Sequence, residues 1–251
     1  MISPANDPQG ARSQDADPRN SDPQDSDPQY SDKAAAAQAA VAEVKDGMLV
    51  GLGTGSTATH AIRAVAGRVA QGLAIRAVAT SRASAALADS LGIRVLDFAD
   101  VPRVDLTIDG ADEIDDACRA VKGAGGAMLR EKVVAAASDR MIVIADGSKR
   151  VAALGAAPVP VEILSFARAS VLAALGPGAT LRLRDGAPYV TDNGNPIADC
   201  RFDLSDPERV AAWLDAIPGV LGHGLFLREV DAAYVAQGGV VSRLERGGLS
   251  G

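Results

Sequence analysis

Four carboxylates lie within the last seven residues of the segment VDLTIDGADEID, which spans residues 104–115. They are Asp109, Asp112, Glu113 and Asp115, and they follow an apolar run typical of a buried strand. Carboxylates this close repel one another, and burying any of them is costly unless each one gains a partner. The segment is therefore either a solvated turn or a binding site for a ligand that carries hydroxyl groups or positive charge.

A glycine-rich turn, GLGTGSTATH over residues 51–60, follows another apolar run and opens a helical pattern. Backbone amides at such a helix start form an anion site, to which Ser56 and Thr57 add hydroxyl donors. The turn also fits the loose dinucleotide pattern GxGxxA. However, no acidic residue between Asp46 and Asp89 is available to bind a ribose, and no GK[ST] follows the glycines. A single phosphate is the favoured ligand, and an ordinary glycine turn is the alternative.

Two lysines and a glutamate stand near the ends of later apolar runs. The segment KGAGGAMLREK places Lys122 before a glycine-rich turn and Glu131 in the helical stretch after it, and IADGSKRV places Lys149 just past a strand. Taken singly, each side chain is explained as an exposed loop or helix residue. Because parallel strands of an open α/β sheet end at one edge, where ligands bind, their joint occurrence indicates a site.

The elements that must position these residues alternate along the chain from Lys33 onward. Short aliphatic strands are expected at residues 48–53, 75–80, 94–98, 104–111 and 140–146. Helices are expected at residues 33–47, 59–72, 81–92 and 125–139. This alternation predicts an α/β fold built on a doubly wound, mainly parallel sheet that is covered on both faces.

The pattern of elements changes in the second half of the chain. Here the order strand–helix–strand–strand–helix–strand predicts a second, smaller ferredoxin-like α+β domain at residues 156–227. Residues 33–155 plus 228–251 are expected to form a Rossmann-like catalytic domain. The Asp/Pro-rich leader, residues 1–32, is nearly devoid of aliphatic side chains, so we predict that it is disordered.

The bulk composition argues against several classes of protein. A net charge of −7 over 251 residues is unlike that of a nucleic-acid or membrane-surface binder. No apolar run approaches the roughly 20 residues of a membrane span, and no secretory signal is visible. The two cysteines, Cys118 and Cys200, are far apart in sequence and lack metal-binding spacing, which favours free thiols in a cytoplasmic protein.

The blocks GLGTGSTA, DGADEID, KGAGGAMLREK and DGSKRV, in this order, resemble the A-type ribose-5-phosphate isomerases. The likeness covers most of the chain from about Lys33 onward. It implies an aldose–ketose isomerase that interconverts D-ribose 5-phosphate and D-ribulose 5-phosphate in the pentose phosphate pathway. It also implies a homodimer that uses neither a metal ion nor an organic cofactor.

The resemblance also implies roles for individual residues. Glu131 would be the base that moves a proton between C1 and C2. Lys122 and the amides of the 123–126 turn would stabilise the enediolate oxygen, while Asp109 and Asp112 would bind sugar hydroxyls and assist ring opening. The phosphate and the rest of the substrate would be held by Lys33, Thr54, Gly55, Ser56, Thr57, Gly110, Ala111, Gly123, Ala124, Gly125 and Lys149.

Three alternatives remain open at this point. The acidic run could hold Mg²⁺, since hard cations prefer carboxylates, although the two lysines expected nearby would compete with the ion. A non-catalytic sugar-phosphate sensor would need the phosphate turn but not Glu131. An NADP-dependent reductase is favoured only by the GxGxxA pattern and by Arg76 in the second expected strand.

Overall fold

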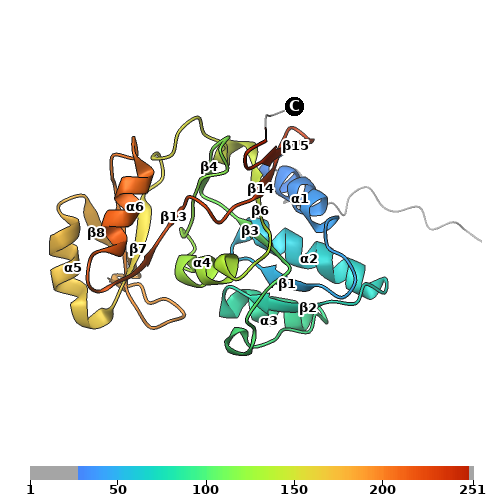
Figure 1. The fold of residues 1–251 in the computed structure, drawn as a ribbon. Coiled ribbons are helices and arrows are strands. Elements are labelled where there is room, and N and C mark those ends of the chain that lie inside the picture. Colours follow the sequence, from blue (N-terminus) through green and yellow to red (C-terminus); the bar gives the residue numbers. More distant parts are fainter. Residues whose placement is uncertain (1–27, 249–251) are drawn as a thin grey trace, which may run out of the picture.

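The computed structural model describes residues 28–248, and its largest element is a six-stranded sheet in the order β15-β14-β6-β3-β1-β2 (Figure 1). Its strands are β1 (Leu49–Leu52), β2 (Arg76–Ala79), β3 (Leu106–Gly110), β6 (Met141–Asp146), β14 (Ala232–Gln237) and β15 (Val240–Glu245). All pairs are parallel except that of β15 with β14. The central strands are short, aliphatic and buried, as a sheet covered on both faces requires.

Alternating side chains of β6 divide the core between the two faces of this sheet. The surrounding helices are α1 (Pro28–Val41), α2 (Ser56–Ala70), α3 (Arg82–Ser90) and α4 (Met128–Ala136). Ile142 and Ile144 pack with residues of α1 and α2, whereas Met141 and Val143 pack with residues of α4 on the other face. The α3 helix contacts α2 and β2. The predicted doubly wound α/β arrangement is therefore confirmed.

The carboxyl ends of β1 and β3 flank the point at which the strand order reverses. The chain leaves β1 for β2 on one side and returns to β3 on the other, so β1 lies between them. Open α/β sheets bind their ligands at such a switch point. The turn after β1 and the acidic run that starts at the end of β3 both begin there.

A second, antiparallel sheet with the strand order β12-β7-β11-β8 lies beside the first (Figure 1). Its elements are β7 (Val159–Ile163), α5 (Arg168–Leu175), β8 (Ala179–Leu181), β11 (Ile197–Cys200), α6 (Pro207–Asp215) and β12 (Val220–His223). A short hairpin of β9 (Leu183–Arg184) and β10 (Ala187–Pro188) stands between β8 and β11. This β-α-β-β-α-β order is that of the predicted ferredoxin-like part. We call residues 159–223 the small module.

A third sheet connects the two parts of the fold. It contains β4 (Glu113–Ile114), β5 (Ala120–Val121) and β13 (Leu225–Phe226), and β13 follows directly on the small module. The short 3-10 helices are η2 (Phe98–Asp100), η3 (Gly147–Lys149) and η4 (Ser165–Ala167). The amide of Lys122, at the end of β5, donates to the carbonyl of Gly224 at 2.9 Å. The division into domains at 155/156 and 227/228 stays a prediction.

Three expectations need correction: the end of the leader, the helix expected at residues 33–47, which ends at Val41, and the strand expected at residues 94–98. Helix α1 begins at Pro28, so the leader predicted over residues 1–32 ends earlier; residues 1–27 lie outside the described part of the chain. The reason is that Asp32 is buried and accepts hydrogen bonds from the Gly238 and Gly239 amides at 3.0 and 2.8 Å.

The strand expected at residues 94–98 is likewise wrong, since only one bridge, between Ala77 and Val95, forms there. The chain turns away because the Asp97 side chain accepts a hydrogen bond from the Ala99 amide at 3.0 Å and opens η2. Within residues 28–248, no helix has both the length and the apolar character needed to cross a bilayer.

Candidate active site

A pocket of about 300 Å³ opens beside the carboxyl ends of β1 and β3. It brings together the residues that the sequence analysis assigned to the site, with the exception of Asp109. The lining residues are Lys33, Thr54, Gly55, Ser56, Thr57, Gly110, Ala111, Asp112, Lys122, Gly123, Ala124, Gly125, Glu131 and Lys149. They come from separate segments, so only the folded chain assembles them.

One end of the pocket is rich in groups that bind anions. Gly55 is the N-cap of α2 and has a φ of 103°, and no side chain caps the first amides of that helix. Lys33, from α1, donates to the Ser56 hydroxyl at 3.4 Å, and Lys149 enters from η3. Two ammonium groups, a hydroxyl pair and an uncapped helix start are suited to a phosphate group.

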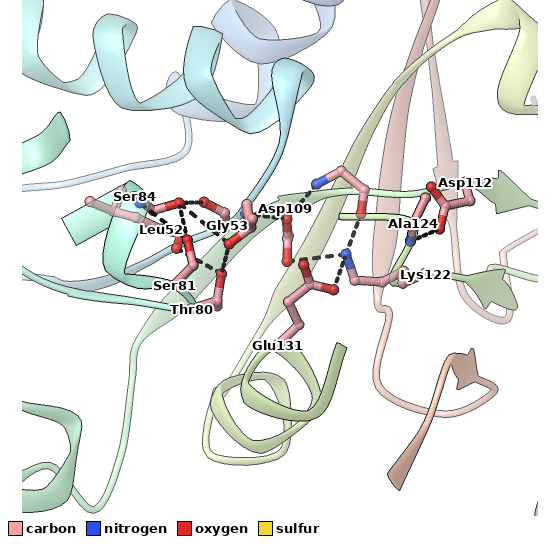
Figure 2. A network of polar contacts seen from close by, with 12 residues as sticks. Leu52, Gly53, Thr80, Ser81, Ser84, Asp109, Asp112, Lys122, Ala124 and Glu131 are labelled. Carbon is pink, nitrogen blue, oxygen red and sulfur yellow. Dashed lines mark hydrogen bonds and ion pairs between the residues drawn. The ribbon is translucent and has the colours of Figure 1, made fainter. Parts of the chain in front are cut away.

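A buried lysine lies between two carboxylates at the other end (Figure 2). The Lys122 ammonium is 3.1 Å from Asp109 Oδ2 and 3.1 Å from Glu131 Oε2, and it donates to the Gly110 carbonyl. The Lys122 side chain is only 2% exposed and that of Glu131 4%. The two carboxylate oxygens are ion-paired with the lysine, but neither receives a well-directed hydrogen bond. Because Glu131 lines the pocket, its carboxylate retains lone pairs that a reacting group there could use.

The electrostatics of this trio follow from burial and from the two like charges. Burial raises the pKa of Glu131, the Asp109 carboxylate raises it further, and Lys122 opposes both, so the pKa lies at about 8. Burial lowers the pKa of Lys122, but the two carboxylates outweigh it, so the pKa of this lysine is raised. The lysine thus stays charged, while the glutamate can gain or lose a proton near neutral pH.

Asp109 lies beneath the pocket rather than in its lining. Its Oδ1 atom accepts hydrogen bonds from the amides of Thr54 at 2.9 Å and Gly110 at 2.7 Å. A Cβ atom on Gly53 would stand 2.1 Å from the same oxygen, so only glycine lets the two loops approach this closely. With one oxygen bonded to backbone and the other to Lys122, the fully buried Asp109 differs from the expected hydroxyl-binding residue.

A network of hydroxyl groups, which was not predicted from the sequence, holds the loop after β1 through side chains of the loop after β2 and of α3 (Figure 2). The Thr54 hydroxyl lies 2.7 Å from that of Thr80, and Ser84 donates to the Gly53 carbonyl at 2.6 Å. Ser81 caps α3 and donates to the Ser84 hydroxyl at 2.9 Å. No pattern in the sequence links the loop after β2 to the loop after β1, because their contact exists only in the folded sheet.

The acidic run itself divides into separate roles. Asp112 lines the pocket and accepts a hydrogen bond from the Ala124 amide at 2.9 Å. Glu113 instead binds two amides of the 155–157 segment at 2.8 and 2.5 Å, and Asp115 pairs with a neighbouring arginine at 2.8 Å. Within residues 28–248, no three or more His, Cys, Asp or Glu side chains are grouped so as to hold a metal ion.

The described geometry defines what the pocket can do chemically. A carboxylate with a raised pKa can take a proton from carbon and return it near neutral pH. A neighbouring ammonium and the amides of a glycine-rich loop can meet negative charge that develops on an oxygen. The anion-binding end would hold a substrate by a group remote from the reacting atoms.

Comparisons with known proteins point to one family. Residues 76–239 match the family model of ribose 5-phosphate isomerase A (phosphoriboisomerase A). Ribose-5-phosphate isomerase A of Sphingopyxis alaskensis is 52% identical over 209 residues, which cover 82% of this chain and 92% of that relative. The protein of the same name from Parvibaculum lavamentivorans is 50% identical over 195 residues, covering 73% and 84%.

Solved structures agree with the sequence relatives. A D-ribose-5-phosphate isomerase in complex with phospho-erythronic acid superposes with a TM-score of 0.83 at 33% identity, covering 87% of this chain and 99% of that one. Ribose 5-phosphate isomerase from Plasmodium falciparum gives a TM-score of 0.81 at 34% identity, covering 85% and 97%. The likeness therefore extends over both the large sheet and the small module.

Proposed function

This chain belongs to the ribose-5-phosphate isomerase A family, and we propose that its pocket interconverts D-ribose 5-phosphate and D-ribulose 5-phosphate. The observation that carries the assignment is the buried trio of Lys122, Asp109 and Glu131 at one end of a pocket whose other end suits a phosphate. A pentose phosphate carries its reacting carbons at one end and its phosphate at the other. The substrate's two ends thus match the two ends of the pocket.

Glu131 is the proposed base. Its carboxylate takes the proton from C2 of the open-chain aldose while electrons shift to the C1 carbonyl oxygen, which gives the enediolate. The carboxylate then returns this proton to C1, and the proton of the C2 hydroxyl passes to the oxygen on C1, which leaves the ketone at C2. One carboxylate suffices because the proton leaves and returns on adjacent carbons. Placement on α4, with a side chain that is only 4% exposed, keeps solvent from competing for this proton.

Lys122 and the glycine-rich loop are the proposed stabilisers of the enediolate. The ammonium is held at 3.1 Å from the base, so a carbonyl oxygen beside the base would also be beside the lysine. The loop of residues 123–126 lies immediately after Lys122 and contributes amides to the same part of the pocket. Removing one donor to such an oxyanion typically lowers kcat by about 10²–10³-fold.

The other residues of the pocket have separate proposed roles in binding the sugar, holding Lys122 and binding the phosphate. Asp112 is exposed to the pocket and is proposed to accept hydrogen bonds from sugar hydroxyls and to assist ring opening. Asp109 is proposed to hold Lys122 and the amide of Thr54 in place from below. Lys33 and Lys149, with the donors of residues 54–57, bind the phosphate.

We further propose that the enzyme works as a cytoplasmic homodimer and needs neither a metal ion nor an organic cofactor. Self-association is supported by β15, which is the edge of the six-stranded sheet and carries Val240 with 72% of its surface exposed. An exposed edge of this kind favours pairing with another chain. Light scattering would report the molar mass, and an isomerase assay with a chelator would test the need for metal.

The decisive experiment replaces the base by its amide. Glu131→Gln keeps the shape of the side chain but cannot take a proton, so kcat should fall by about 10²–10⁴-fold with KM nearly unchanged. Ketose formation from ribose 5-phosphate is the measurement. Glu208→Gln, on the exposed side of α6 with 52% of its side chain accessible, is the matched control. A fully active Glu131→Gln enzyme would show that another residue moves the proton.

A further inference from the structure

The loop that follows Lys122 is held from outside the pocket by two side chains of the small module. Arg182 Nη1 donates to the carbonyl of Gly123 at 3.0 Å and to that of Ala124 at 3.1 Å. The Tyr189 hydroxyl donates to the carbonyl of Gly125 at 3.3 Å. Three successive carbonyls of this loop are therefore bound by the small module and face away from the substrate pocket.

The direction of these carbonyls determines where the loop amides point. Because a trans peptide is planar, its N–H lies opposite to its C=O. A Gly123 carbonyl turned toward Arg182 therefore sends the Ala124 amide toward the pocket, where it meets Asp112 Oδ2 at 2.9 Å. By the same geometry, the hydrogen bond from Arg182 to the Ala124 carbonyl turns the Gly125 amide toward the pocket, which Gly125 lines.

The loop has little to hold it in this shape by itself. Gly123 and Gly126 have φ angles of 109° and 83°, a region that only glycine adopts at low cost, and one turn bond joins the Gly126 amide to the Gly123 carbonyl at 2.9 Å. A Cβ atom on Gly126 would stand 2.3 Å from the Tyr189 hydroxyl oxygen, so Tyr189 packs directly on the loop. External contacts must therefore select this conformation from the many that glycines allow.

Arg182 is itself fixed by its neighbours. The Asp199 carboxylate on β11 accepts hydrogen bonds from Arg182 Nε at 2.8 Å and from Arg182 Nη2 at 2.5 Å. This two-point pairing fixes the orientation of the guanidinium plane. Its backbone amide donates to the Ile197 carbonyl at 2.8 Å, and its carbonyl accepts from the Tyr189 amide at 2.8 Å. The side chain is 15% exposed, so the guanidinium is largely shielded from water.

We propose that Arg182, oriented by Asp199 and assisted by Tyr189, is a positioning residue that aims the Gly125 amide of the loop at the oxygen on which negative charge develops. The inference rests on the proposed isomerase function. It gives the small module a task in catalysis although Arg182 and Tyr189 do not line the pocket. Misplacing a catalytic group by about 1 Å can cost on the order of 10²-fold in rate, so loss of the arginine should act mainly on kcat.

The test compares Arg182→Met, Arg182→Lys and Tyr189→Phe with the wild-type enzyme. Arg182→Met should lower kcat about 10- to 100-fold and leave KM for ribose 5-phosphate within about threefold, because the phosphate contacts lie on other loops. Arg182→Lys keeps one charged donor but loses the two-point pairing with Asp199. Its kcat should therefore lie between that of Arg182→Met and that of the wild-type enzyme. Tyr189→Phe keeps the ring and loses one bond, so kcat should fall about 3- to 10-fold.

A binding measurement separates positioning from general damage. Phospho-erythronic acid carries a carboxylate where the enediolate charge would develop, so its affinity should fall in Arg182→Met in parallel with kcat, while that of inorganic phosphate stays constant. Arg201→Met is the matched control, because Arg201 donates to the Ala156 carbonyl at 3.1 Å and does not touch the loop. This control should keep wild-type kcat and wild-type affinity for phospho-erythronic acid.

The outcomes distinguish the two proposals. A wild-type protein that does not isomerise ribose 5-phosphate would overturn the proposed function and this inference with it. An active wild type with an unchanged kcat in folded Arg182→Met would overturn the positioning role alone. Should Arg182→Met fail to give a folded protein by circular dichroism, Tyr189→Phe decides, and an unchanged kcat in that variant refutes the role.

Discussion

The raised pKa of Glu131 leads to a specific pH dependence of catalysis. Burial and the nearby Asp109 carboxylate place this pKa at about 8, and only the ionised form can accept a proton from carbon. A raised pKa means that the proton is retained to higher pH, so activity should be lost as the pH falls through about 8. The free enzyme should therefore be mostly in its inactive, protonated form at pH 7.

The size of the effect follows from the ionised fraction of this one group. At pH 6.5, about 1.5 units below the pKa, roughly 3% of Glu131 is ionised, so kcat/KM should rise about 30-fold between pH 6.5 and a plateau above pH 9. The assay is initial-rate ketose formation in buffers of constant ionic strength. Working above pH 6.5 limits interference from the substrate phosphate, whose own second pKa is about 6.

A variant tests the assigned cause. Asp109→Asn removes the charge that ranks second to burial in raising the pKa of Glu131, while its amide oxygen can still accept from Thr54 and Gly110. The midpoint of the kcat/KM profile should therefore move to lower pH. A wild-type profile that is flat from pH 6.5 to 9 would refute the reasoning, since it would mean that burial leaves Glu131 ionised throughout.

Two further substitutions probe the phosphate end and the contact between loops. Lys149→Ala should raise KM about tenfold or more with little change in kcat, because a hydrogen bond to a charged group contributes about 1.5–3 kcal/mol. Lys45→Ala is the control, since Lys45 is exposed. A normal KM in the Lys149 variant would show that this lysine does not bind the phosphate. Gly53→Ala should lower both activity and melting temperature, because its methyl group would stand 2.1 Å from Asp109 Oδ1. Gly67→Ala, in the interior of α2 with open space around it, should instead be neutral or stabilising by up to about 1 kcal/mol, and equal behaviour of the two variants would contradict the close approach.

Much of the fold was predictable because hydrophobic periodicity is a local property of the chain. The alternation of aliphatic strands with helices indicated the doubly wound sheet, and the later strand–helix–strand–strand–helix–strand order indicated the ferredoxin-like part. The early start of α1 has a non-local cause, and the loss of the strand expected at residues 94–98 depends on a single side chain. Asp32 extends α1 toward the N-terminus by binding amides of the distant 238–239 turn, and Asp97 ends the expected strand at residues 94–98.

The candidate site was predictable to the extent that its residues sit in short contiguous motifs. Glycine-rich turns and lysines at strand ends have a type and a spacing that can be recognised, and a parallel sheet brings its strand ends to one edge. For this reason the pocket lining matches the assigned residues closely. Asp109 is the instructive exception: its position at the end of β3 was visible, but its burial beneath the pocket depends on the close approach of Gly53.

The amino-acid order alone determined which chemical groups were available: a glutamate and a lysine flanking a glycine-rich turn, carboxylates after a strand, and an anion-binding helix start. Only the tertiary structure decided how the groups act, because packing buries Glu131 and so raises its pKa. Packing also docks the small module so that Arg182, 59 residues from Gly123, reaches the loop carbonyls. Burial and contacts between distant segments depend on the whole fold, and no local pattern encodes them.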